Sequence, residues 1–249
     1  MRTFGLIGYP LSHSFSQGYF TKKFSNENIA DAEYKNFPIE KIAQFPELIQ
    51  ANPGLCGLNV TIPYKREIIP FLDGLDKTAR QVNAVNTIKF VRDDNDKLKL
   101  IGYNTDIYGF ELTINPHLTR AHKKVLILGT GGASNAVEYV LRKLGLQCFY
   151  VSRKMGERIF KSYDQLTNED LEDFQVIINT SPVGMYPKVD DCPLIPYEGI
   201  TASHVMYDLI YNPEATLFLK KGREHGAQTI NGLEMLHLQA EKAWKIWNS

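Results

Sequence analysis

The sequence has little cysteine and no apolar run long enough to cross a membrane. Its three cysteines, Cys56, Cys148 and Cys192, are scattered among 249 residues, and none of them forms a C-x-x-C pair. Such a set predicts free thiols and no metal site, and it fits a reducing cytoplasm. A bilayer-spanning helix needs about 20 consecutive apolar residues, and no run approaches that length. We therefore expect neither a membrane partner nor a metal.

An excess of charge of either sign is also missing. The chain has 28 basic and 28 acidic residues. Nucleic-acid-binding proteins usually carry a basic excess or a basic stripe, so we expect no nucleic-acid partner. The N-terminus leads almost at once into a predicted strand, without the charged and apolar regions of a secretory signal. These observations favour an ordinary globular protein that acts on small molecules.

The first part of the chain alternates predicted strands and helices, and several strands end in polar residues. This pattern is typical of an open α/β sheet that binds a ligand at the carboxyl ends of its strands. An Asp-rich turn at 93–96 predicts a hairpin between the last two strands. The predicted strands are 4–8, 33–38, 55–61, 84–91 and 98–103, and the predicted helices are 16–27, 40–50, 78–82 and 106–118.

The stretch 59–65 is the most informative of these strand ends. It carries the amide of Asn59, the hydroxyl of Thr61 and the amine of Lys65, and Pro63 stiffens the backbone by fixing its own φ. Several hydrogen-bonding groups on a rigid strand end suit a small polyhydroxylated ligand. The alternative is a strand end with polar residues by chance.

A glycine-rich turn follows the fully apolar strand predicted at 125–128. Residues 129–134 read Gly-Thr-Gly-Gly-Ala-Ser, and a predicted helix at 135–144 comes next. Glycines let the backbone approach a pyrophosphate, and a helix N-terminus attracts its charge. The match to G-x-G-x-x-G is imperfect, since Ser134 takes the third glycine position. The strand-turn-helix context nevertheless predicts a Rossmann-like domain.

The end of the next predicted strand, at 147–152, indicates which nicotinamide cofactor is bound. An NAD enzyme places a carboxylate there to bind the ribose hydroxyls. This chain instead has Ser152, Arg153 and Lys154, followed by Arg158. Guanidinium and ammonium groups attract a 2′-phosphate, so we predict NADP rather than NAD. A solvated basic turn is the alternative.

Together these segments resemble the shikimate dehydrogenase family, NADP-dependent enzymes that reduce 3-dehydroshikimate. The resemblance implies two α/β domains with a cleft between them. Residues 1–105 plus 232–249 would form a substrate domain with an open mixed sheet, and residues 106–231 a Rossmann-like NADP domain. It is compatible with a monomer or a homodimer. The motifs that carry it lie at 8–16, 59–65, 84–87, 102–106, 129–134, 179–185, 208–213 and 231–240.

Lys65 and Asp106 match the catalytic pair of that family. Reduction of a ketone delivers hydride to carbon while the oxygen takes a proton. A lysine can donate that proton or stabilise the forming alkoxide, and the aspartate would orient the lysine and bind a ring hydroxyl. The alternatives are a solvated surface lysine and an aspartate that caps a helix.

The resemblance also implies which residues bind substrate and cofactor. For Thr180 and Ser181 the alternative role is to cap a strand end, and for Met235 it is core packing. Gln17 stands where the family usually has proline, and Asn83 where glycine is common. The matched substrate residues are Ser14, Ser16, Asn59, Thr61, Asn86, Tyr211 and Gln239. The matched cofactor residues are Gly129, Gly131, Gly132, Ala133, Ser152, Arg153, Lys154, Arg158, Thr180, Ser181, Gly232 and Met235.

Two other functions stay open at this stage. A dehydrogenase that also accepts quinate would use the same chemistry on a substrate with one more hydroxyl. A catalytically silent metabolite-binding relative would be expected to lose the lysine or the aspartate, and this chain keeps both.

Overall fold

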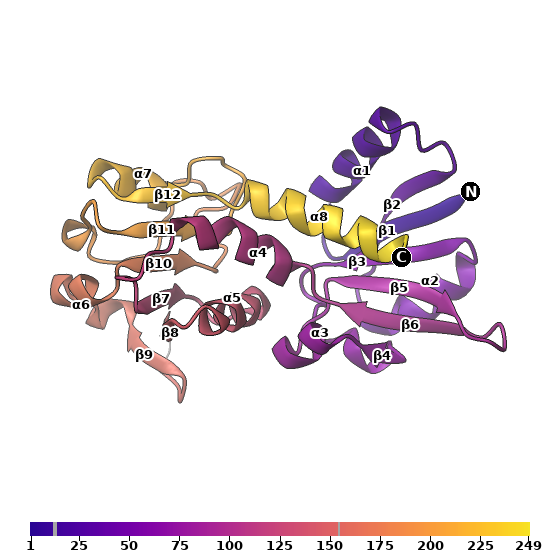
Figure 1. Ribbon diagram of the computed structural model, residues 1–249, viewed down its shortest axis with the longest axis horizontal. Coiled ribbons are helices and arrows are strands. Elements are labelled where there is room, and N and C mark those ends of the chain that lie inside the picture. The colour runs from indigo at the N-terminus through magenta and orange to yellow at the C-terminus, as the bar shows by residue number, and fades with distance from the viewer. Residues whose placement is uncertain (12–13, 154) are drawn as a thin grey trace. The chain divides into compact units, whose positions relative to one another are not determined.

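The computed structural model of the protein describes residues 1–11, 14–153 and 155–249 (Figure 1). These residues form two compact units. The first unit consists of Met1–Thr105 and Ala240–Ser249, and the second of Asp106–Gln239. Each unit contains a six-stranded sheet that is covered by helices. The predicted α/β class with two sheets is therefore confirmed.

The first unit has a mixed sheet. Its elements are β1 (Arg2–Gly8), α1 (Phe15–Asn26), β2 (Ala32–Pro38), α2 (Phe45–Ala51), β3 (Leu55–Val60), β4 (Gly74–Leu75), α3 (Lys77–Val82), β5 (Thr87–Arg92) and β6 (Leu98–Tyr103), with 3-10 turns at Ile42–Gln44 and Ile69–Phe71. The strand order is β2-β1-β3-β5-β6-β4. β1 pairs in parallel with β2 and β3, whereas β5 is antiparallel to β3 and β6. The carboxyl ends of β1, β2 and β3 therefore meet at one edge.

The strand predicted at 84–91 begins three residues late, at Thr87. Asn83 ends α3 in the left-handed region, with φ of 50°, which asparagine tolerates better than most residues. Residues 84–86 then lead into the sheet as an extended link, and the main-chain N–H of Asn86 donates to Tyr103 O (3.0 Å). Asparagine therefore adopts here the left-handed conformation that ends α3.

Two hydrophobic clusters cover the two faces of the first sheet. On one face, Phe4 of β1 and Phe20 of α1 pack with Trp247, whose indole N–H donates to Ile88 O (3.0 Å). The last turns of the C-terminal helix therefore belong to the core of the first unit. On the other face, Ile7 of β1 packs with residues from α2, α3 and β3. Neighbouring side chains of a strand point to opposite faces, which explains this division.

The second unit has a fully parallel sheet. Its elements are α4 (Asp106–Ile114), β7 (Lys124–Leu128), α5 (Gly132–Lys143), β8 (Gln147–Ser152), β9 (Ile159–Ser162), α6 (Asn168–Asp173), β10 (Val176–Asn179), β11 (Val205–Asp208), α7 (Leu217–Glu224), β12 (Gln228–Ile230) and the first part of α8 (Leu233–Trp247), up to Gln239, with 3-10 turns at Asn115–His117, Tyr163–Gln165 and Tyr197–Gly199. The order β12-β11-β10-β7-β8-β9 is that of a Rossmann sheet. The strand order reverses between β7 and β10, where ligands bind in such sheets.

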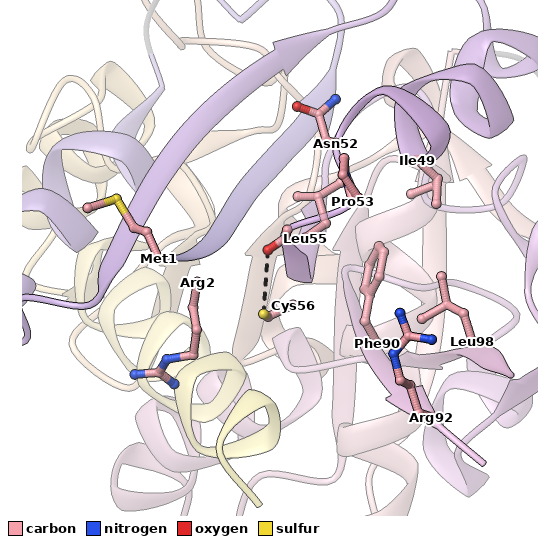
Figure 2. A pocket seen from close by; sticks show the side chains of 11 residues that line it. Met1, Arg2, Ile49, Asn52, Pro53, Leu55, Cys56, Phe90, Arg92 and Leu98 are labelled. Carbon is pink, nitrogen blue, oxygen red and sulfur yellow. Dashed lines mark hydrogen bonds between the residues drawn. The ribbon is translucent and has the colours of Figure 1, made fainter. Parts of the chain in front are cut away.

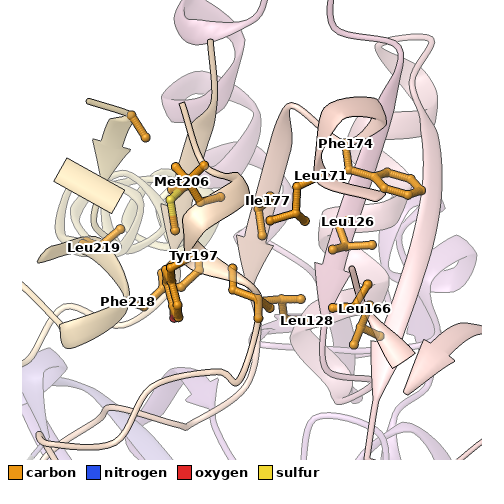
Figure 3. Close-up of a cluster of buried hydrophobic side chains, with 14 residues drawn as sticks. Leu126, Leu128, Leu166, Leu171, Phe174, Ile177, Tyr197, Met206, Phe218 and Leu219 are labelled. Carbon is orange, nitrogen blue, oxygen red and sulfur yellow. The ribbon is translucent and has the colours of Figure 1, made fainter. Parts of the chain in front are cut away.

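The core of the second unit lies between its sheet and the helices α6 and α7 (Figure 3). Leu126 and Leu128 of β7 point to this side, together with Ile177 of β10 and Met206 of β11. Phe218 of α7 closes the cluster. These residues are at most 8% exposed, and Val125 and Ile127, which alternate with them along β7, are also buried. Burial on both faces of the sheet explains why the strands read as continuous apolar runs in the sequence.

Candidate active site

A network of buried polar side chains lies at the carboxyl edge of the first sheet. Asn59, on β3, is its centre. Its Oδ1 accepts a hydrogen bond from Tyr34 (2.7 Å), and its Nδ2 donates to Asn86 O and Thr87 Oγ1 (both 3.2 Å). Both hydrogens of the Asn59 amide are thus used inside the protein. The amide thereby holds Asn86 and Thr87 next to β3.

Asn86 connects this network to the chain just before α4. Its Oδ1 accepts from the main-chain N–H of Thr105 (2.7 Å), and its Nδ2 donates to Thr105 Oγ1 (3.0 Å). Thr105 directly precedes Asp106, the first residue of α4, which is only 8% exposed. The bonds from Asn86 therefore fix the backbone from which the Asp106 carboxylate projects.

Lys65 lies in the turn that follows β3. The main-chain N–H of Thr61 donates to Ile7 O (2.9 Å), which keeps this turn beside β1. Lys65 O accepts from Val85 N (2.7 Å), so the lysine backbone is fixed next to the residue that precedes Asn86. The Lys65 side chain is half-buried. Thr61, Lys65 and Asn86 are therefore brought together at one edge of the first sheet.

Ser14 and Ser16 lie at the N-terminus of α1. Ser14 is the N-cap, and its hydroxyl accepts from the main-chain N–H of Gln17 (3.4 Å). Proline at position 17 could not donate this bond. The Gln17 side chain in turn accepts from Asn36 (2.9 Å). Two hydroxyls and the N–H groups of a helix start suit a carboxylate ligand.

In the second unit, the glycine turn leads directly into α5. Gly129 has φ of 101°, a conformation that favours glycine, and Gly131 is the N-cap of α5. The space in front of Gly131 and Gly132 is open, because a Cβ atom built on either would meet nothing within 4 Å. Helix α5 begins three residues earlier than predicted, within the turn. The first N–H groups of a helix, here including that of Ala133, have no partner within the helix, and next to this open space they suit a pyrophosphate.

Two polar residues after β10 lie against this turn. Thr180 Oγ1 donates to Leu128 O (2.9 Å), and Ser181 Oγ donates to Asn179 Oδ1 (2.7 Å). A Cβ atom on Gly129 would be 3.2 Å from both Thr180 Oγ1 and Ser181 Cβ. β7 and β10 thus bring together the two loops at the point where the strand order reverses.

The basic residues after β8 differ in their surroundings. Arg153 is exposed, and Ser152 is half-buried at the strand end. Arg158 instead forms an ion pair with Glu138 of α5 and lies over the Tyr150 ring (5.0 Å). This contact holds Arg158 on the α5 side. Lys154, also predicted to bind the cofactor, lies outside the described residues.

The remaining predicted residues lie after β11 and along α8. Tyr211 is half-buried, and burial raises the pKa of its hydroxyl. Gly232 packs so closely on Leu209 that a Cβ atom would collide with the Leu209 carbonyl. Met235 packs against Gly109 of α4, and the Gln239 amide donates to Leu236 O (2.9 Å).

Asp208, which the sequence analysis missed, is completely buried at the end of β11. Its carboxylate accepts from Asn179 (3.1 Å), from the main-chain N–H of Ile210 (3.0 Å) and from Thr216 (2.6 Å). It thereby fixes the loop that carries Ser181 and the turn that carries Tyr211. A charged residue at the end of an apolar strand is the signal that could have identified it.

We expect Asp208→Asn to change how stability depends on pH. Burial raises the pKa of Asp208 to about 7, against its three hydrogen bonds, whereas an unfolded aspartate titrates near pH 3.9. Between about pH 4 and pH 7 the folded protein keeps a proton that the unfolded chain has lost, so the free energy of unfolding falls as the pH rises. Asparagine does not titrate. The melting temperature of the variant, relative to that of the wild type, should therefore rise from about pH 4 to pH 7. A difference between the two melting temperatures that does not change with pH would refute the assignment.

A pocket of about 350 Å³ lies in the first unit, at the amino ends of β1 and β3 (Figure 2). Arg2 and Arg92 line it, together with apolar side chains such as Phe90. Arg2 already bonds to Asp31 and Arg92 to Asp96, so both cations are neutralised locally. The pocket lies at the edge opposite to the polar network.

Over the residues that the structure describes, no three His, Cys, Asp or Glu side chains are grouped to hold a metal ion. Nor is any helix in those residues long and apolar enough to cross a membrane. The three cysteines are free thiols, as predicted. Burial raises the pKa of Cys148 to about 12, so this thiol is not a reactive nucleophile.

Comparison with known proteins identifies relatives that are named shikimate dehydrogenase. A family model described as "Shikimate dehydrogenase substrate binding domain" matches residues 6–88. The shikimate dehydrogenase (NADP(+)) of Clostridium beijerinckii is 40% identical, over 99% of this chain and 92% of the relative. A solved shikimate dehydrogenase in complex with NADP+ is 35% identical, with a TM-score of 0.86 over 99% of this chain and 90% of that one. The Thermus thermophilus enzyme in complex with NADP(H) and shikimate is 25% identical, with a TM-score of 0.84 over 99% and 93%.

Proposed function

The chain belongs to the shikimate dehydrogenase family, and from this premise we propose that it catalyses the reversible NADP-linked reduction of 3-dehydroshikimate to shikimate. The observation that carries the proposal is the match over nearly the full length to relatives with this activity in their names. Two features of the fold support it. One is the polar network at the edge of the first sheet. The other is the open glycine turn between β7 and α5 in the second unit.

We assign substrate binding to the first unit and cofactor binding to the second. The family model for a substrate-binding domain matches residues 6–88, all of which belong to the first unit. The Rossmann strand order supports the second assignment. We propose the bounds 1–105 with 232–249 for the substrate domain and 106–231 for the NADP domain, which differ from the two units only at residues 232–239.

NADP fits the groups around the glycine turn. The backbone of Gly129, Gly131, Gly132 and Ala133 would hold the pyrophosphate at the start of α5. Arg153 would bind the 2′-phosphate, and from the sequence we assign supporting roles in cofactor binding to Ser152, Lys154 and Arg158. When bound, the cofactor supplies or accepts the hydride. Thr180, Ser181, Gly232 and Met235 would line the nicotinamide half of the site.

Substrate binding uses the groups at the edge of the first sheet. Ser14 and Ser16 would bind the substrate carboxylate at the N-terminus of α1, assisted by Tyr211. Thr61 and Asn86 would bind ring hydroxyls, and Gln239 would add a further hydrogen bond. Asn59 contributes by holding Asn86 and Thr87 in position. Rigid placement of these groups aligns the reacting carbon and reduces the entropy lost on reaching the transition state.

We assign to Lys65 and Asp106 the transfer of the proton that the carbonyl oxygen of the substrate takes up. The Lys65 ammonium would donate a proton to the carbonyl oxygen as that oxygen gains negative charge, and in the reverse direction the neutral amine of Lys65 would take the proton from the hydroxyl. The Asp106 carboxylate would orient the ammonium and bind a neighbouring hydroxyl. Its backbone is fixed by the bonds between Asn86 and Thr105. We further propose a cytoplasmic protein that acts as a monomer or a homodimer.

Rates of NADP+ and NAD+ reduction with shikimate and with quinate test this proposal. We expect rapid growth of reduced-nicotinamide absorbance with shikimate and NADP+, and much slower growth in the other three combinations. Equal rates with quinate would instead identify a dual-specificity enzyme. Binding of shikimate without any turnover would identify a silent relative and refute the proposed activity.

A further inference from the structure

Glu138 lies in the middle of α5, and its carboxylate contacts two cations. Its Oε2 accepts from the Tyr150 hydroxyl of β8 (2.8 Å) and forms the ion pair with Arg158. Its Oε1 accepts from Arg142 Nε (2.9 Å), one turn further along α5. Burial alone would raise the pKa of Glu138, but its hydrogen bonds to Tyr150 and Arg142 lower that pKa below its ordinary value. A negative charge therefore lies beside β8, whose end carries the proposed 2′-phosphate site.

This carboxylate holds Arg158, one of the basic residues predicted to bind the cofactor. The Arg158 guanidinium also lies over the Tyr150 ring (5.0 Å), with Nη2 3.3 Å from the Tyr150 hydroxyl. The Arg158 side chain is nevertheless 60% exposed, so a ligand anion can approach it. An ion pair exposed in this way is weak, and a phosphate monoester carries more charge than a carboxylate. The guanidinium can therefore exchange Glu138 for a bound phosphate.

The strand register places Arg158 within reach of the proposed 2′-phosphate site. Ile159, the first residue of β9, pairs with Tyr150, and β8 ends two residues later at Ser152. Arg158 thus lies beside β8 roughly 7 Å from the carboxyl end of that strand, a distance that a long arginine side chain can span. Arg153 directly follows this end and is exposed. Once released from Glu138, Arg158 can bind the same phosphate as Arg153.

We propose that Glu138 is a specificity-determining residue: its carboxylate competes with the 2′-phosphate of NADP+ for Arg158 and so limits the preference for NADP+ over NAD+. The inference rests on the proposed NADP-linked function and deepens it. Arg158 must leave Glu138 before it can help Arg153 to neutralise the phosphate, and this lowers the affinity for NADP+. NAD+ has no phosphate at this place and leaves the ion pair intact. A charge that opposes only one of two ligands changes the ratio of their affinities.

The test is Glu138→Gln, with binding measured by calorimetry. Glutamine keeps an oxygen that can accept hydrogen bonds but no charge, so the fold should be retained, and a melting curve verifies this. We expect the Kd for NADP+ and that for adenosine 2′,5′-bisphosphate to fall about fivefold, while the Kd for NAD+ changes less than about twofold. The gain should shrink at high salt, because the interaction is between charges near the surface. Calorimetry requires no turnover.

Glu111→Gln is the matched control. Glu111 of α4 also forms an ion pair with a cation of α5, Lys143 (2.7 Å), but Lys143 is at the end of that helix away from the glycine turn. The same loss of charge should there leave all three Kd values unchanged. In a second comparison, Glu138→Gln is made in an Arg158→Met background. The gain should then disappear, because Glu138 acts through Arg158.

The outcomes separate this role from the proposed function. A folded Glu138→Gln with an unchanged or raised Kd for NADP+ would overturn the competition. Equal gains for NADP+ and NAD+, or a gain that persists without Arg158, would show a general effect of charge and also overturn it. A wild type that bound NADP+ but did not oxidise shikimate would refute the proposed activity, and the calorimetric comparison would still decide the role of Glu138.

Discussion

Lys65→Ala is expected to lower the turnover of shikimate by about 10³-fold, within the usual contribution of a proton-transfer group. The variant keeps the cofactor site intact, so the KM for NADP+ should change by less than about twofold. The Lys65 main chain is held by its bond from Val85, which alanine preserves, so the fold should be retained. Steady-state rates with saturating NADP+ measure the effect, and a melting curve verifies the fold.

Lys97→Ala is the control for this change. Lys97 is exposed in the turn between β5 and β6 and has no part in the polar network. Its loss should leave turnover unchanged. If Lys65→Ala keeps more than a tenth of the wild-type turnover, the proton comes from another group and the assignment of Lys65 is wrong.

Arg153→Asp is expected to raise the KM for NADP+ by about 100-fold and to change the KM for NAD+ little. The guanidinium would lose its charge-assisted bonds to the 2′-phosphate, and the new carboxylate would repel that phosphate. NAD has no such phosphate, and a carboxylate here can accept bonds from its ribose hydroxyls. Initial rates with each cofactor at saturating shikimate measure the two values.

Arg120→Asp makes the same change of charge elsewhere in the second unit. Arg120 is exposed in the segment before β7, at the edge opposite to the glycine turn. Both KM values should stay close to those of the wild type. A parallel rise for NADP+ and NAD+ in Arg153→Asp would show that the arginine binds a group common to both cofactors.

Apolar periodicity was enough to predict most of the fold. The run at 125–128 and the glycines after it predicted β7, the turn and α5, because a buried parallel strand and a helix start leave distinct local patterns. The short strand β9 was missed. Its four residues include the exposed Phe160 and show no clear alternation. The start of α5 at Gly132 was not predicted, because glycine residues in a row are typical of a loop.

The candidate site was predicted only in part, since some of its contacts depend on tertiary structure. Asn59 was predicted to bind a ligand hydroxyl, and its amide also bonds to Tyr34 and Thr87, which no local pattern reveals. The ion pair between Arg158 and Glu138 joins residues that are 20 positions apart. Tyr34 resembles any aromatic residue of a buried strand, and only its hydrogen bond to Asn59 distinguishes it from phenylalanine.

The position of the Lys65 ammonium in a complex with NADP+ and shikimate tests the account most directly. A crystal structure of that complex should place Lys65 Nζ within about 3.2 Å of both the reacting hydroxyl and an Asp106 carboxylate oxygen. A Lys65 side chain that points into solvent, with the hydroxyl bonded to other groups, would contradict the account.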